Sequence, residues 1–350
     1  PVGLGYRVPL IVASPWSRGG WVNSEVFDIS STIMFMEKLL SHKTGKKIKE
    51  DNISSWRRTV SGDLTSVFRP YNGEKIDLPD FLTMEGHVKK ILNASYKDIP
   101  DNFKVLTDAE ISQVNNTHLQ SPLMPKQEPG TKPSNALAYE LYVEGEFNRS
   151  HDAIVLDLSA SDKKFGKEAL GAPFTVYAPG GYKDPKSNTF ENAKNWSFAV
   201  KAGDSLNYIW PLDAFEGNTY HLQVYGPNGF FREFKGNKND PKLSLNSSYS
   251  LDSKSKTGYY NIEMENTSMG SLTIEVRDNA YKHGKNSMTV LAGEKQAIRV
   301  STSKSKGWYD FTLRTIGNTT FSRRYCGRLE LGLDSISDPL MGGEVSFKLG

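Results

Sequence analysis

Two hydrophobic patterns divide the chain. In the first 120 residues apolar side chains recur mainly at helical spacing, whereas from Ala136 onward they alternate with polar ones. Helical spacing indicates amphipathic helices, and alternation indicates half-buried strands. The sequence therefore predicts a mainly helical first part and an all-β second part.

The first part opens on a short apolar run at 7–13, typical of a strand buried on both faces. Four helices should follow, and a buried strand followed by helices is typical of the end of an α/β domain. Because one strand cannot make a sheet, we expect the other strands of that domain to precede Pro1. The expected helix starts are Asp28 or Ser30, Asn52 or Ser54, Pro79, and a capping box at Thr107–Glu110. The apolar faces of the first three include Ile33, Met36 and Leu40; Trp56, Val60, Leu64 and Val67; and Phe81, Met84, Val88 and Ile91.

The second part contains a repeated pattern, Phe-x-Arg-x-aromatic-x-Gly, at 230–236 and 321–327. An alternating strand and a turn precede each copy, so each reads as a β-hairpin. Ala202 and Ala292, Tyr220 and Tyr309, and Gly236 and Gly327 are 90, 89 and 91 residues apart. Three anchors at nearly one spacing predict a duplicated β-domain, and two units of this length suggest β-sandwiches.

These patterns give a domain layout. Four prolines and Gly130 between Ser121 and Ser134 predict a linker. Lys235 to Asp240 is a polar junction between the two β units. The predicted parts are the end of an α/β domain at 1–120, a linker at 121–135, β-sandwiches at 136–237 and 241–335, and a tail at 336–350.

Composition narrows the function. With 37% hydrophobic and 24% charged residues, the chain resembles an ordinary globular protein. A net charge of +3, with basic residues spread rather than clustered, does not favour nucleic acid as a partner. Cys326 is the single cysteine, which excludes an intrachain disulfide and a cysteine-based zinc site.

The sequence shows no complete catalytic site. None of the six histidines forms a pair at metal-ligand spacing, and no metal is predicted in this chain. Asp77 and Asp80 flank a Leu-Pro turn and are expected to cap the following helix rather than bind metal.

The loop Ser14–Trp21 is the candidate binding site. It follows the predicted strand at 7–13, and ligands of open α/β sheets bind beyond the carboxyl ends of strands. Trp16 and Trp21 offer aromatic faces for a cation, and Arg18 offers a guanidinium for a phosphate. The alternative is that both tryptophans fill core against the helix at 31–40.

Arg232 and Arg323 are predicted to be structural. Alternation places each arginine between two aromatic side chains on one strand face, which indicates a packed cation–π stack with the charged tip in water. Cys326 lies on the other face from Arg323 and is expected to be inert.

Several motifs resemble the bacterial phosphocholine-specific phospholipases C, of the non-haemolytic type. They are Gly5–Pro9, Ser14–Val22, Val26–Asp28, Trp56–Arg58, Gly62–Ser66, Gln127–Thr131 and Ser337–Pro339, in order along residues 1 to about 341. The sequence departs from the resemblance at Ile29, where family members commonly have histidine, and at Ser61, often cysteine.

The resemblance implies a catalytic domain of the alkaline phosphatase superfamily and two copies of a small C-terminal β-domain. It further implies hydrolysis of phosphatidylcholine or sphingomyelin to phosphocholine by a metal-activated hydroxyl nucleophile. The nucleophile and the acidic ligands of a divalent metal are then expected upstream of Pro1, and the fragment alone is expected to be inactive. The expected setting is secreted or periplasmic, and the expected partners are a phospholipid or membrane surface and the missing N-terminal catalytic region.

Two other functions stay open. In the first alternative, the fragment is a non-catalytic binding module whose β-domains dock on lipid or on the catalytic domain. In the other, the parent protein is a phosphatase or phosphodiesterase that acts on soluble phosphoesters.

Overall fold

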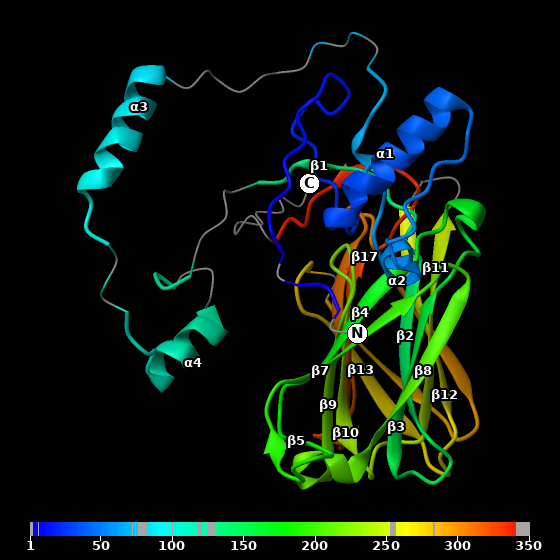
Figure 1. Cartoon of the computed structure of the whole chain (residues 1–350). Coiled ribbons are helices and arrows are strands. Elements are labelled where there is room, and N and C mark those ends of the chain that lie inside the picture. The colour runs from blue at the N-terminus through cyan, green and yellow to red at the C-terminus, as the bar shows by residue number, and fades with distance from the viewer. Residues whose placement is uncertain are drawn as a thin grey trace.

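The helices occupy the first third of the chain (Figure 1). The structure is a computed structural model that describes residues 3–5, 7–71, 73, 75, 83–99, 101, 103–117, 121–124, 130–252, 257–282 and 284–340. Its α-helices are α1 (Ile29–Thr44), α2 (Ser55–Val60), α3 (Met84–Asn93) and α4 (Asp108–Thr117). Short 3-10 turns lie at Thr65–Val67 and Ala94–Tyr96 in this part, and at Gly166–Glu168, Leu212–Ala214 and Glu216–Asn218 in the β region. No described helix combines the length and apolar character needed to span a membrane.

The predicted helix starts are confirmed where the structure describes them. Asp28 caps α1, because its side chain accepts a hydrogen bond from the Ser30 N–H, and Ser54 caps α2. Thr107 and Glu110 form the predicted capping box at α4. The start at Pro79, Phe81, and the aspartates at 77 and 80 lie outside the described residues.

The helices are less buried than their patterns suggest. Ile33, Met36 and Leu40 of α1 are 45%, 44% and 37% exposed, whereas Met34 is 7% exposed. In Figure 1, α3 and α4 lie apart from the β region, and neither has a buried residue. Helix α2 ends at Val60, so Leu64 and Val67 lie beyond it; Ser61 has extended backbone and ends the helix.

The strand predicted at 7–13 is wrong. This segment has no regular structure, and Val8, Leu10 and Ile11 are 81%, 59% and 89% exposed. A strand needs a neighbour that pairs with its N–H and C=O groups. Among the described residues, no sheet includes this run.

The β region confirms the predicted strands and hairpins. Its first half contains β2 (Leu141–Phe147), β3 (Ala153–Ala160), β4 (Ala172–Ala178), β7 (Lys194–Val200), β8 (Asp204–Pro211), β9 (Thr219–Tyr225) and β10 (Phe231–Asn237). The second half contains β11 (Leu243–Asp252), β12 (Thr257–Asn266), β13 (Leu272–Asp278), β14 (Lys285–Val290), β15 (Lys295–Ser301), β16 (Trp308–Thr315) and β17 (Ser322–Arg328). Two-residue strands complete the set: β5 (Tyr182–Lys183) with β6 (Phe190–Glu191), and β1 (Pro133–Ser134) with β18 (Ser335–Ile336).

Both halves have the same strand order. In each, the first, second and fifth of the seven long strands form a three-stranded sheet, β2-β3-β8 or β11-β12-β15. The other four join a larger antiparallel sheet, in the order β10-β9-β4-β7 and β17-β16-β13-β14. The spacing of 89 to 91 residues in the sequence therefore matches equivalent strands in the structure.

The two larger sheets are not separate. Strand β10 pairs with β17, so they form one eight-stranded sheet, β14-β13-β16-β17-β10-β9-β4-β7. The register is symmetric: Arg232 lies opposite Tyr325, and Phe234 lies opposite Arg323. The two repeated motifs meet each other at the centre of this sheet.

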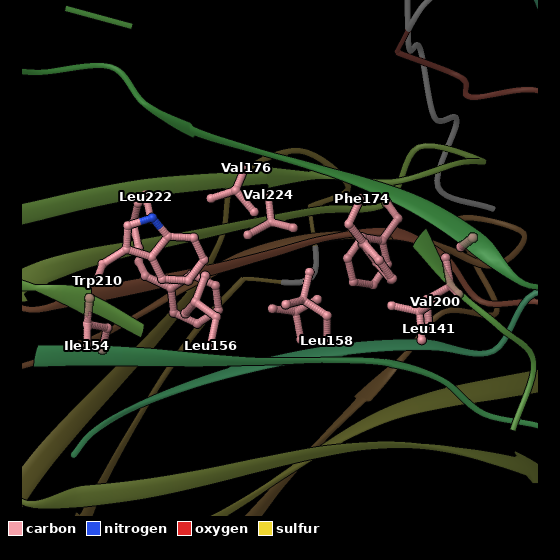
Figure 2. Packing of buried hydrophobic residues seen from close by; sticks show 14 of the residues in the cluster. Leu141, Ile154, Leu156, Leu158, Phe174, Val176, Val200, Trp210, Leu222 and Val224 are labelled. Atoms are coloured by element: carbon pink, nitrogen blue, oxygen red, sulfur yellow. The ribbon is translucent and has the colours of Figure 1, made fainter. Parts of the chain in front are cut away.

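Each half has its own apolar core between its two sheets. Figure 2 shows the first core, where Phe174, Val176 and Val224 of the larger sheet point toward Leu156 and Leu158 of the smaller one. The second core is built the same way from β11 to β17. Its fully enclosed members include Tyr260, Ile262, Ile274, Val290 and Leu313, each 0% exposed.

The arginine tips are buried, which corrects the prediction that they reach water. Arg232 is 0% exposed and Arg323 is 4% exposed. The predicted cation–π stacks are present: the guanidinium carbons lie 4.0 Å from the Phe230 ring centroid and 4.4 Å from that of Phe321. A buried guanidinium is tolerated when its N–H groups are hydrogen-bonded, and each tip finds partners in the other half of the β region.

Candidate functional site

The loop Ser14–Trp21 is shaped by its own serines. The Ser17 N–H donates to the Ser14 carbonyl at 3.2 Å, and the Ser17 hydroxyl donates to the Val12 carbonyl at 3.0 Å. The Trp16 N–H donates to the Ser14 hydroxyl at 3.2 Å. The chain leaves this turn through Gly19 and Gly20, whose φ angles of 96° and 65° favour glycine.

The three predicted site residues differ in how far they are exposed to solvent. Trp16 is 56% exposed, so it does not fill core against α1 as the alternative expected. Arg18 and Trp21 are half-buried. Trp16 alone of the three is therefore largely open to solvent.

All three residues contact the segment 69–71. The Arg69 N–H donates to the Trp16 carbonyl at 2.7 Å. The Arg18 guanidinium carbon lies 5.0 Å from the Tyr71 ring centroid, and that of Arg69 lies 3.4 Å from the Trp21 ring centroid. The loop is thus held along its length by this one segment.

A wide, open cleft of about 1790 Å³ lies beside the loop. Trp21, Arg69 and Ile29 line it on the side of the N-terminal part. Tyr177, Tyr225, Phe231 and Arg324 line it on the side of the eight-stranded sheet. Trp16 and Arg18 are not among its lining residues, so of the predicted site residues only Trp21 faces this space.

Charged groups lie at the cleft near the start of α1. Asp28 forms an ion pair with Arg57, and Glu25 accepts a hydrogen bond from the Ser66 hydroxyl. Burial raises the pKa of Glu25 despite that hydrogen bond. Ile29, one of the two positions at which the sequence departs from the resemblance, is 83% exposed and lines the cleft.

The described residues include no group of three or more histidine, cysteine, aspartate or glutamate side chains placed to hold a metal ion.

Sequence reasoning missed Arg69 and Tyr71. Neither belongs to a motif, and Arg69 is separated from Trp21 by 48 positions along the chain. No local signal pairs them, because the contact exists only after the chain has folded back on the loop.

Comparison with known proteins shows which families the two parts of the chain match. The model for the C-terminal domain of bacterial phospholipase C matches residues 133–237 and again 243–328, and the phosphoesterase family model matches residues 1–41. A non-hemolytic phospholipase C of Pseudomonas aeruginosa is 34% identical over 99% of this chain and 45% of its own length. A non-hemolytic phospholipase C of Burkholderia pseudomallei and a hemolytic phospholipase C of P. aeruginosa are each 29% identical over 97% of this chain, and 44% and 45% of their own lengths.

The chain thus spans less than half the length of these three relatives. Its first 41 residues match a phosphoesterase, and its antiparallel β region matches one domain model twice. The chain belongs to the bacterial phospholipase C family, as a short helical piece of the phosphoesterase followed by the C-terminal β region in two parts.

Proposed function

We propose that this chain is the C-terminal part of a phospholipase C that hydrolyses phosphatidylcholine or sphingomyelin and releases phosphocholine. The chain supplies one wall of the head-group site and β modules that dock on lipid or on the catalytic domain. The loop Ser14–Trp21 carries the proposal. It presents an exposed indole at Trp16, with a guanidinium at Arg18, in a segment that matches the phosphoesterase family.

The chemistry of choline supports this use of the loop. A quaternary ammonium cannot donate ordinary N–H hydrogen bonds, so an aromatic face is among the few groups that hold it well, at about 0.5–2 kcal/mol per ring. The phosphate beside it suits a guanidinium fork. Trp16 and Arg18 are two residues apart and supply one group of each kind.

The test uses the full-length enzyme with Trp16→Ala and, as a matched control, Trp16→Phe. Trp16→Ala should raise KM for choline lipids more than for ethanolamine lipids, and Trp16→Phe should retain most of the preference because it keeps a ring. Equal losses for both head groups, together with a large fall in melting temperature, would make Trp16 a packing residue and sink the proposal.

A second test concerns the fragment. The purified 350-residue chain should release no phosphocholine with added divalent metal, because we place the nucleophile and the metal ligands in the remainder of the enzyme. Removing such groups typically costs several kcal/mol of barrier. Turnover at the rate of a phospholipase would contradict this.

The remaining proposals concern the metal, the partners and the cellular location of the enzyme. We place the divalent metal in the parent enzyme, with ligands from the remainder of the catalytic region. The exposed apolar side chains of Val8, Leu10 and Ile11 suit contact with the rest of the catalytic region. A secreted or periplasmic setting and a phospholipid surface fit the proposed substrate.

A further inference from the structure

We infer that Asp334 and Arg69 are positioning residues for the loop Ser14–Trp21, so that the end of the β region sets the geometry of the proposed head-group wall. The expected effect of this contact on substrate binding rests on the proposed function. The positioning contact itself does not.

The first step is the contact between Arg69 and Trp21. The guanidinium carbon lies 3.4 Å from the ring centroid, so the guanidinium covers one face of the indole. A ligand cation cannot stack on that covered face and must use the other face of Trp21 or the exposed ring of Trp16. Through its N–H, Arg69 also fixes the Trp16 carbonyl at 2.7 Å. Displacing Arg69 therefore disturbs both tryptophans.

The second step is the anchor of Arg69 itself. Its Nη2 lies 2.5 Å from Oδ2 of Asp334, 265 residues further along the chain. The other oxygen, Oδ1, accepts a hydrogen bond from the Ala136 N–H at 3.0 Å. The hydrogen bond from Arg69 holds the pKa of Asp334 below its ordinary value, so the carboxylate is charged at neutral pH.

The third step is the backbone around this pair. The Val22 N–H donates to the Pro133 carbonyl at 2.8 Å, and the Asn135 N–H donates to the Val22 carbonyl at 3.1 Å. Strand β1 in turn pairs with β18, where Ser134 lies opposite Ser335. The residue after Trp21 and the residue after Asp334 are thus tied to the same short strand.

The pair contributes more to position than to stability. The Arg69 and Asp334 side chains are 28% and 42% exposed, and ion pairs so open to solvent contribute little to folding. The variant Asp334→Asn should therefore fold normally, while Arg69 loses the charge that directs it toward the β region.

The experiment labels the chain with 5-fluorotryptophan and follows the ¹⁹F resonance of Trp21, assigned with Trp21→Phe. Asp334→Asn and Arg69→Met should each shift this resonance, and the double variant should show no further shift, because the two residues act through one contact. Asp157→Asn, on an exposed aspartate of β3, is the matched control and should leave the resonance in place.

The same Asp334→Asn change in the full-length enzyme should raise KM for choline lipids about two- to fivefold, as the loss of one cation–ring contact implies, with kcat little changed. An unmoved Trp21 resonance in Asp334→Asn and Arg69→Met overturns the inference, whatever the activity. A moved resonance with an unchanged KM supports the positioning contact and removes the loop from the head-group site, so the two proposals fail separately.

Discussion

Arg232 and Arg323 occupy equivalent positions in the two halves of the β region, and their surroundings differ in one respect. Nη1 of each donates to two main-chain carbonyls, one of its own strand and one of the neighbouring strand in the other half: Phe231 and Cys326 for Arg232, Ser322 and Lys235 for Arg323. Nη2 of each crosses to a tyrosine of the other half, Tyr309 at 3.1 Å for Arg232 and Tyr220 at 2.7 Å for Arg323.

The difference lies in the negative charge. The Asp240 carboxylate lies 3.7 Å from Arg323, with both side chains at most 5% exposed. Arg232 instead has a second hydroxyl, that of Tyr260 at 3.0 Å. The Glu144 carboxylate, which accepts a hydrogen bond from Tyr325 at 3.1 Å, attracts Arg232 electrostatically. One buried guanidinium is neutralised by contact, and the other is held by hydroxyls and a more distant charge.

The glycine that ends each motif makes room for these partners. Gly236 lies opposite Tyr220, and Gly327 lies opposite Tyr309. A Cβ at Gly236 would come within 2.2 Å of an Asp240 oxygen, and one at Gly327 within 2.8 Å of the Tyr309 hydroxyl. The motif therefore encodes the arginine, its aromatic stack and the space for its partner, while the carboxylate comes from outside the motif.

The strongest test of this comparison removes each arginine. Arg323→Ala should lower the free energy of unfolding by about 3–5 kcal/mol, because it leaves the buried Asp240 carboxylate without its partner. Adding Asp240→Asn should recover part of that loss. Arg232→Ala should lower the free energy of unfolding by about 2–4 kcal/mol through lost packing and hydrogen bonds. Adding Glu144→Gln to it should recover a smaller share of the loss than Asp240→Asn recovers in Arg323→Ala. Urea denaturation of the four variants measures these values, and equal recovery in both pairs would remove the distinction.

A weaker test removes one hydroxyl from each site. Tyr220→Phe should cost about 1–3 kcal/mol, because Arg323 loses its tyrosine acceptor and Asp240 loses a donor. Tyr309→Phe should cost about 1 kcal/mol, because Tyr260 still accepts from Arg232. Thermal or urea unfolding compares the two, and a larger loss for Tyr309→Phe would contradict the proposed difference.

The dependence on pH tests the more distant charge. Burial raises the pKa of Glu144 above its ordinary value, with the Ser247 hydrogen bond and Arg232 opposing it. A carboxyl whose folded-state pKa is raised stabilises the fold fully below its unfolded pKa, near 4.5, and loses that contribution as pH rises through the folded-state value. The stability of the wild type relative to Glu144→Gln should therefore be higher at pH 4 than at pH 8. Urea denaturation at the two pH values measures this, and the opposite sign would refute it.

The smallest expected effect concerns Cys326, whose counterpart in the other motif is Lys235. Burial raises the pKa of the Cys326 thiol well above its usual range, with a further contribution from Asp310. Because the thiolate is the reactive form, a thiol reagent such as DTNB should label the native chain far more slowly than the chain unfolded in urea. Rapid labelling of the native chain would show that the thiol is accessible and reactive.

The sequence by itself determined the local elements and the repeat. Alternation and helical spacing identify most strands and the described helix starts, because both patterns follow from which faces of an element are buried. The spacing between Tyr220 and Tyr309 and between the two arginine motifs was sufficient to predict that the halves are alike. Seven short motifs, in order along the chain, were sufficient to indicate the family.

Only the tertiary structure decided how these elements combine. The run at 7–13 reads as a buried strand, yet among the described residues it has no partner strand, and pairing is a property of neighbours rather than of one segment. Burial of Arg232 and Arg323 depends on the pairing of β10 with β17, which places each guanidinium beside a tyrosine of the other half, 77 residues away for Arg232 and 103 for Arg323. The contact of Arg69 with Trp21 and Asp334 likewise joins three distant parts of the chain. Periodicity reports which face of an element is apolar, whereas such contacts depend on where folding brings each face, and no local pattern records that.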